Sequence, residues 1–179
     1  MSVTWEAIRA FLFNPFAQPL WLKYLMQGSG SFLAVFAFTI MLGAGGKILI
    51  FNSIVAFLSW DTYALLLDLG WSNFAATFMG TLVVAIAAQI GARRYRTPVT
   101  MVIIPSLYPL VPGAPIYRCV NAIFYERMDQ AGAFAIQAFI MAASIAMAVF
   151  LVESAVMLLK QRKMDTNNEP PAAPTQSVH

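Results

Sequence analysis

Four prolines that recur within eleven residues carry the clearest chemical signature in this sequence. Pro105, Pro109, Pro112 and Pro115 are spaced four, three and three residues apart, and Gly113 follows the third proline. On an ideal helix this spacing would place the prolines along one stripe. Each proline, however, lacks an N–H and clashes with the carbonyl four residues back. The pattern therefore predicts a helix that kinks or unwinds near residues 109–113.

A broken helix of this kind has two interpretations inside a bilayer. Freed carbonyls are tolerated there only beside protein or a water-filled cavity, and transporters use such breaks to bind substrates or ions at mid-membrane. The alternative is a rigid kink that only shapes packing, because Pro and Gly are common in membrane helices. Four prolines in one segment favour the functional interpretation.

Tyr117 and Arg118 follow the proline series directly. An Arg at the mouth of a broken helix would attract an anionic carboxylate through paired hydrogen bonds. Alternatively, the pair anchors the helix at the lipid headgroups, with the long Arg side chain extending to the interface. Both interpretations stay open.

Asp61 is the acidic residue best placed for a role within the membrane. Asp61 and Asp68 are seven residues apart, which is close to two helical turns, so they share one helix face. A carboxylate inside a membrane helix usually faces a cavity or a partner, which suggests proton coupling or a buried pair with an Arg. If the span is shifted toward its N-terminus, Asp61 becomes an interface residue, as Asp68 is in either case.

The side chains that most enzymes use are scarce. Cys119 is the sole cysteine and His179, the sole histidine, is the last residue. Four-ligand zinc sites need several Cys or His residues, and a Ser–His–Asp triad needs a histidine at its centre. We therefore expect no enzymatic activity, no metal and no cofactor.

The composition identifies the environment of these residues. Of the 179 residues, 60% are hydrophobic and 11% are charged, and the mean hydropathy is +0.70. An ordinary soluble domain is about 45–50% apolar and about 25% charged, so a soluble domain, a nucleic-acid-binding module and a disordered chain are excluded as first interpretations. The sequence predicts an integral membrane protein.

Five segments are long and apolar enough to cross a hydrocarbon core about 30 Å thick. The expected fold is an all-α bundle of about five transmembrane helices, the fourth broken by its prolines, with spans at about residues 25–43, 48–69, 72–92, 97–117 and 131–159. These spans make up a membrane domain of residues 25–160. Residues 1–24 are expected to form an interfacial segment on the membrane surface, because Pro15 and Pro19 interrupt them. Residues 161–179 are expected to be a disordered cytoplasmic tail.

Basic residues near helix ends indicate the orientation, because cytoplasmic loops carry an excess of Lys and Arg. With five spans, four basic residues lie on one side: Arg9, Lys23, Arg118 and Arg127. The other side holds seven: Lys47, Arg93, Arg94, Arg96, Lys160, Arg162 and Lys163. We predict that the N-terminus is outside and the C-terminus is cytoplasmic.

Small residues in the last span predict close helix contacts. Ala138, Ala142 and Ala146 form a ridge along one face, and such ridges let membrane helices approach closely. Because five helices make a small bundle for a transport path, a hetero- or homo-oligomer is a reasonable expectation.

The stretch from Pro105 to Arg118 resembles the signature of the threonine/serine exporter family. The residues that carry the likeness are Pro105, Pro109-Leu110-Val111-Pro112-Gly113, Tyr117 and Arg118. The likeness extends over roughly residues 32–162, and the chain is most similar to the small subunit of the family's split, two-component form. The first 24 residues and the span containing Trp60-Asp61 depart from the family pattern.

The resemblance implies a secondary transporter of the bacterial inner membrane that exports a small amino acid or dicarboxylate of the threonine, serine or succinate class. It also implies a larger membrane partner with a soluble domain and about five spans of its own. The alternative is a membrane scaffold that transports nothing and only assembles or stabilises a partner. No nucleic-acid partner is expected.

Overall fold

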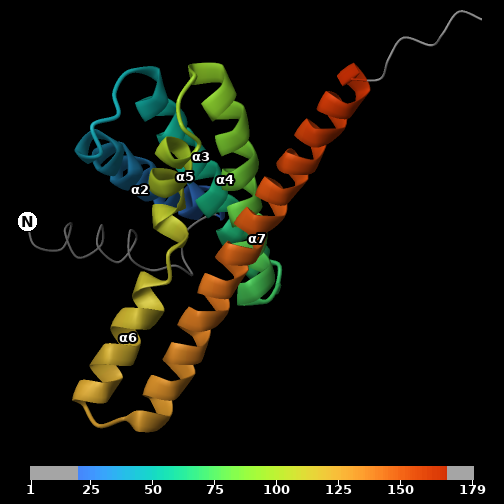
Figure 1. Ribbon diagram of the computed structural model, residues 1–179. Coiled ribbons are helices and arrows are strands. Elements are labelled where there is room, and N and C mark those ends of the chain that lie inside the picture. Colours follow the sequence, from blue (N-terminus) through green and yellow to red (C-terminus); the bar gives the residue numbers. More distant parts are fainter. Residues whose placement is uncertain (1–19, 169–179) are drawn as a thin grey trace, which may run out of the picture.

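The computed structural model describes residues 20–168, and throughout that range the regular structure is helical (Figure 1). The helices in chain order are α2 (Leu20–Met41), α3 (Lys47–Asp68), α4 (Asn73–Tyr95), α5 (Thr100–Leu107), the 3-10 helix η1 (Tyr108–Leu110), α6 (Gly113–Phe124) and α7 (Met128–Asn168). The expectations for residues 1–19 and 169–179 lie outside the described residues. The prediction of a disordered tail is wrong for residues 161–168, which continue helix α7.

Four of these helices are long and apolar enough to cross a membrane, namely α2, α3, α4 and α7. A fifth span is formed if the residues from Thr100 to Leu110 and helix α6, which are bent by 49° relative to each other, are counted as one crossing. The predicted all-helical membrane fold with about five spans is confirmed at this level.

The helix ends follow local sequence signals. Ser72 caps α4 by accepting a hydrogen bond from the Ala75 N–H at 3.3 Å. Gly43 and Gly46 adopt positive φ in the turn between α2 and α3, a conformation that glycine adopts without steric cost. Helix α2 begins at Leu20 rather than at the predicted Leu25, because no proline follows Pro19 before its end.

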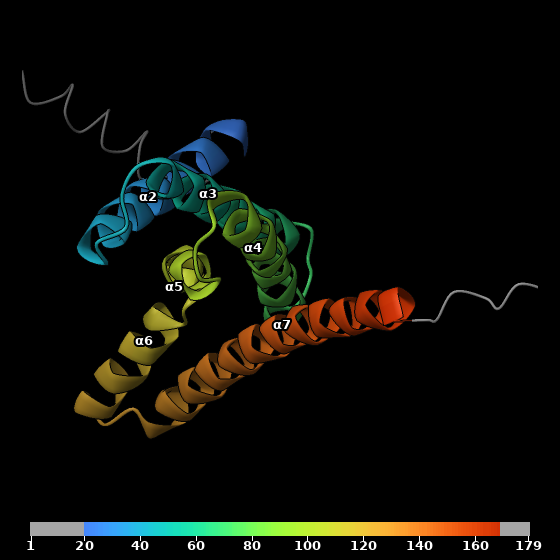
Figure 2. The same cartoon turned by 45° about the horizontal axis from the view of Figure 1, so that its top comes forward.

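Helices α2, α3 and α4 pack in sequence order, and α5 lies against all three of them (Figures 1 and 2). Helix α6 packs against α7 alone among the described elements. In both views α6 and the first part of α7 form a hairpin that projects from the α2–α5 bundle, whereas the middle of α7 packs on α4. There the Ser144 hydroxyl donates to the Phe74 carbonyl at 2.8 Å. With 41 residues α7 is about 60 Å long, roughly twice the thickness of a hydrocarbon core.

An ion pair closes the bundle where α2 begins and α3 ends. The Lys23 ammonium lies 2.6 Å from the Asp68 carboxylate, and the Tyr24 hydroxyl donates to the same carboxylate at 2.8 Å. The pair is partly exposed, so its net contribution to stability is small. Its position shows that the first and second spans are antiparallel and that Asp68 lies at a helix end.

The core brings α3, α4 and η1 into direct contact. Val55, Val84 and Leu110 form its buried centre. Gly80 allows the close approach of α3 and α4, since a Cβ at this position would lie 3.0 Å from the Ser59 carbonyl oxygen and 3.4 Å from the Leu110 side chain. Leu110 therefore fixes the broken segment to the rest of the bundle.

We expect Gly80→Val to destabilise the protein by about 1–3 kcal/mol, because the added side chain would overpack a contact with backbone. Gly30→Val is the matched control, since a Cβ on Gly30 meets nothing within 4 Å. The measurement is the free energy of unfolding in detergent micelles. Equal stability of the two variants would contradict the close α3–α4 contact.

Candidate functional site

The candidate site is the chain break between α5 and α6. Helix α5 ends at Leu107, and the 3-10 turn that follows ends at Leu110. Val111 is extended, with φ −59° and ψ 133°, and Pro112 has φ −72° and ψ 49°. The helix resumes at Gly113 in a new direction, which is where the proline spacing predicted a kink or an unwound turn.

The first proline frees a carbonyl that a side chain from another helix takes up. Pro105 lies inside α5 and has no N–H for the carbonyl of Met101, four residues earlier. The side-chain amide of Asn52, on α3, donates to that carbonyl at 3.1 Å. Asn52 is fully buried, so this hydrogen bond replaces the missing helical one away from water.

The other prolines leave carbonyls that neighbouring backbone N–H groups take up. Each of these carbonyls accepts a hydrogen bond from an N–H two or three residues further along the chain. The three-residue bonds form 3-10 turns, and the two-residue bond closes a still shorter turn. These bonds run from Tyr108 N–H to the Pro105 carbonyl, from Val111 N–H to Tyr108 at 3.3 Å, and from Gly113 N–H to Val111 at 2.7 Å. The carbonyls expected to be free at the break are thus all hydrogen-bonded within the chain.

Ser106 adds a second link between the broken segment and α3. Its hydroxyl donates to the backbone carbonyl of Asn52 at 3.4 Å, and Ser106 is fully buried. Asn52 therefore holds α5 from two sides, through its side chain at Met101 and through its backbone at Ser106. The break is fixed at its N-terminal end by this pair of contacts.

Several buried polar atoms on the three helices that pack with α5 have no hydrogen-bond partner. They are the hydroxyls of Thr39 on α2 and of Thr77 and Thr81 on α4, and the side-chain oxygen of Asn52. All four residues are fully buried. A buried polar atom without a partner costs free energy, and in native proteins such atoms usually serve a water, an ion or a functional ligand. The interior of the bundle therefore contains polar atoms, although its sequence is mostly hydrophobic.

Asp61 lies on α3 against the backbone of α2. A Cβ on Gly28 would lie 2.8 Å from the Asp61 side-chain oxygen Oδ1, so the absence of a side chain at Gly28 makes room for the carboxylate. That oxygen is buried and has no hydrogen-bond partner, and neither has the indole N–H of the adjacent Trp60. Asp61 as a whole is half-buried, and its carboxylate makes no ion pair with any described residue, unlike that of Asp68.

Tyr117 and Arg118 lie away from both the break and Asp61. Both are on α6, which packs only on α7 among the described elements, and Tyr117 is 71% exposed. Arg118 lines a cavity of about 210 Å³ near the tip of the hairpin, together with Arg127 and Asn121. The predicted site residues thus fall into three places: Pro105, Pro109, Pro112 and Gly113 at the break, Asp61 between α2 and α3, and the Tyr-Arg pair on the hairpin.

The sequence interpretation missed Asn52 and the three threonines. A signal was present for two of them, because Thr77 and Thr81 are four residues apart on one face of an apolar helix. Asn52 is the only Asn or Gln of α3, and a polar amide within a span usually bonds to another helix. Its target, the Met101 carbonyl, could not be identified without the packing of α3 against α5.

Comparison with known proteins gives one match. The family model described as "Threonine/Serine exporter, ThrE" matches residues 27–155, well over half of the chain. The matched range extends from α2 into α7 and contains the whole break. Searches of curated proteins and of solved structures returned no match.

We expect Asn52→Leu to destabilise the protein by about 1–3 kcal/mol, because the Met101 carbonyl would be buried without a donor. In a Pro105→Ala background the restored N–H can bond to that carbonyl, so the same substitution should cost markedly less. Unfolding free energies of the four proteins in this double-mutant cycle measure the coupling. Ser53→Ala is the control, since its hydroxyl bonds only within α3. An Asn52→Leu cost unchanged by Pro105→Ala would contradict the assignment.

Proposed function

Because this chain belongs to the threonine/serine exporter family, we propose that it is the small subunit of a secondary transporter that exports a small amino acid or dicarboxylate. The proposed substrate classes are those of threonine, serine and succinate. A larger membrane partner with its own soluble domain forms the rest of the transporter. The host membrane is the bacterial inner membrane. Membership in the family supports transport as the activity, and the chain's own residues support the location of the proposed path.

The observation that carries the proposal is a proline-broken helix that packs against three helices carrying buried polar atoms without partners. Hydroxyls both donate and accept hydrogen bonds, so those of Thr39, Thr77 and Thr81 suit a substrate that carries hydroxyl, ammonium and carboxylate groups. The proline break keeps the segment from Pro105 to Gly113 irregular in the midst of a helical bundle. Transporters bind substrates at such irregular segments.

Because the four carbonyls that the prolines would leave without a donor are already hydrogen-bonded, we assign the binding groups of the proposed path to side chains. The unpartnered hydroxyls and the Asn52 side-chain oxygen supply neutral polar contacts. Asp61, whose carboxylate oxygen Oδ1 is buried without a hydrogen-bond partner, supplies the acidic group that would carry a proton in a proton-driven exporter. Arg118, beside Arg127 in the hairpin cavity, supplies positive charge that would attract a carboxylate at the outer end of the path.

The orientation belongs to the same proposal. Arg93 near the end of α4 and Lys160 near the end of the α7 span line one common cavity, so two of the seven basic residues assigned to the cytoplasmic side do lie together. Lys23 and the C-terminal end of α3 meet at the other side. This grouping supports an N-terminus outside and a cytoplasmic C-terminus.

The function is tested by metabolite efflux from cells that lack both this chain and its larger partner. We expect export of threonine, serine or succinate only when both subunits are restored. Pro112→Ala should abolish export while leaving membrane insertion intact, because the restored N–H at position 112 can bond to the Tyr108 carbonyl and change the geometry of the break. Pro98→Ala, in the loop before α5, is the control and should export normally.

Export by Pro112→Ala at the wild-type rate would show that the broken-helix site is wrong. Full tolerance of substitutions at Asp61, Tyr117 and Arg118, with export lost only when the Ala138–Ala146 ridge is enlarged, would instead indicate the scaffold function.

A second prediction separates the two aspartates of α3. We expect Asp61→Asn to reduce export at least tenfold, because the substituted amide cannot take up and release a proton. Asp68→Asn should leave export within about twofold of wild type, since it only weakens a partly exposed ion pair. Initial efflux rates normalised to the amount of protein in the membrane provide the measurement. Equal effects of the two substitutions would remove Asp61 from the proposed path.

A further inference from the structure

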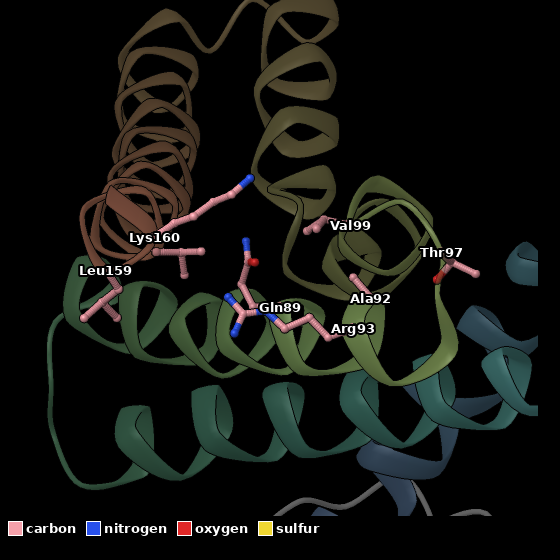
Figure 3. Close-up of a pocket in the computed structure, with 8 residues that line it drawn as sticks. Gln89, Ala92, Arg93, Thr97, Val99, Leu159 and Lys160 are labelled. Atoms are coloured by element: carbon pink, nitrogen blue, oxygen red, sulfur yellow. The ribbon is translucent and has the colours of Figure 1, made fainter. Parts of the chain in front are cut away.

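A cavity of about 630 Å³ lies between α4, the loop before α5 and the later part of α7. Its residues are separate from the unpartnered polar atoms around the proline break. Figure 3 shows Gln89 and Arg93 rising from α4 and Lys160 extending from α7 toward the same space. The cavity therefore concentrates two cationic groups and an amide that no part of the proposed transport path uses.

The polar groups of this cavity are available for a ligand. Within residues 20–168, neither Arg93 nor Lys160 makes an ion pair. The Thr97 hydroxyl oxygen, in the cavity wall, is buried and has no hydrogen-bond partner. A guanidinium, an ammonium and a carboxamide together offer N–H donors directed at one volume, the arrangement that binds a phosphate group.

The other walls and the location of the cavity indicate what carries that phosphate. Ala92, Val156 and Leu159 supply apolar surface beside the cationic groups, and Leu159 is 68% exposed. Arg93 lies in the last turn of α4, and Lys160 lies two residues before Arg162, where the candidate span of α7 ends. The cavity thus sits at headgroup level, with cationic and apolar surface side by side.

We propose that this cavity binds the phosphate of an anionic phospholipid, whose acyl chains lie along the apolar wall of α7. Basic pockets between membrane helices on the cytoplasmic side bind anionic headgroups. The bound lipid fills the space between α4 and α7 and joins the two helices at the end of the bundle. The proposal is independent of the transported substrate, because the cavity shares no residue with the proposed path.

The test is lipid retention by the purified full-length chain in detergent, measured by native mass spectrometry with phosphatidylglycerol or phosphatidylcholine added in equal amounts. Wild-type protein should retain phosphatidylglycerol at least tenfold better than phosphatidylcholine. The double variant Arg93→Gln/Lys160→Gln should bind phosphatidylglycerol roughly 25-fold more weakly, at about fivefold for each charge removed. The charge-conserving pair Arg93→Lys/Lys160→Arg should retain most of the binding.

The matched control is Arg94→Gln/Arg96→Asn, which removes two neighbouring charges that do not line the cavity. Asn is chosen at position 96 because Arg96 has a φ of 54°, which Asn tolerates. This control should bind phosphatidylglycerol within about twofold of wild type. Equal weakening in both double variants would overturn the site, since it would show a general charge effect.

A third arm distinguishes a lipid from a soluble phosphate. Glycerol 3-phosphate should displace phosphatidylglycerol only at concentrations at least a hundredfold higher, because it lacks the acyl chains. Displacement at equal concentration would overturn the lipid assignment in favour of a free phosphate. Circular dichroism of each variant establishes whether its helical content is unchanged, so that weakened binding is not caused by unfolding. If the double variant unfolds, the single substitution Lys160→Gln replaces it, with an expected loss of binding of about fivefold.

Discussion

The hydrogen bond from Asn52 to the Met101 carbonyl is the interaction on which the rest of the bundle depends. A proline within a membrane helix leaves a carbonyl that lipid cannot satisfy, and here the missing donor comes from a neighbouring helix. The bond therefore fixes the rotation and depth of α5 against α3. Ser106 strengthens the same contact, and Leu110, just before the break, then reaches the core beside Val55 and Val84.

This constraint separates the chain into two parts with different packing. The α2–α5 bundle encloses buried polar atoms, whereas α6 and the first part of α7 form a hairpin with few buried side chains. Only the short break and the continuous helix α7 join them. Because short turns satisfy the carbonyls of Pro105, Tyr108 and Val111 locally, the backbone there can hold a fixed bend without support from the hairpin. The buried polar atoms without partners thus belong to the bundle, whereas the hairpin carries exposed polar and basic side chains such as Arg118.

The sequence predicted the environment, the helices and the position of the proline segment, because these depend on composition, length and local backbone chemistry. It did not predict which side chains lie close together in the folded chain. Asp61 and Arg118 were candidates for one path, yet Asp61 contacts α2 at Gly28 while Arg118 belongs to the hairpin. Asn52 was overlooked, because a single amide in an apolar helix reveals its partner only when the packing of two distant helices is known. Thr39, Thr77 and Thr81 were overlooked because their complete burial follows from the packing of the helices, although the four-residue spacing of Thr77 and Thr81 was visible in the sequence.

This arrangement gives the basic residues a second role, besides setting the orientation of the protein. Basic residues at helix ends set the orientation of a membrane protein through their number, whatever their contacts. Here the two ends of the molecule differ in the surroundings of their basic residues as well as in the number of those residues. Arg93 and Lys160 border the larger cavity beside apolar wall, whereas Arg118 and Arg127 border a cavity of about 210 Å³ with the polar Asn121 and Gln130. The first cavity suits a headgroup joined to acyl chains, and the second suits a small soluble anion. The same kind of residue can therefore hold lipid at one end and attract substrate at the other.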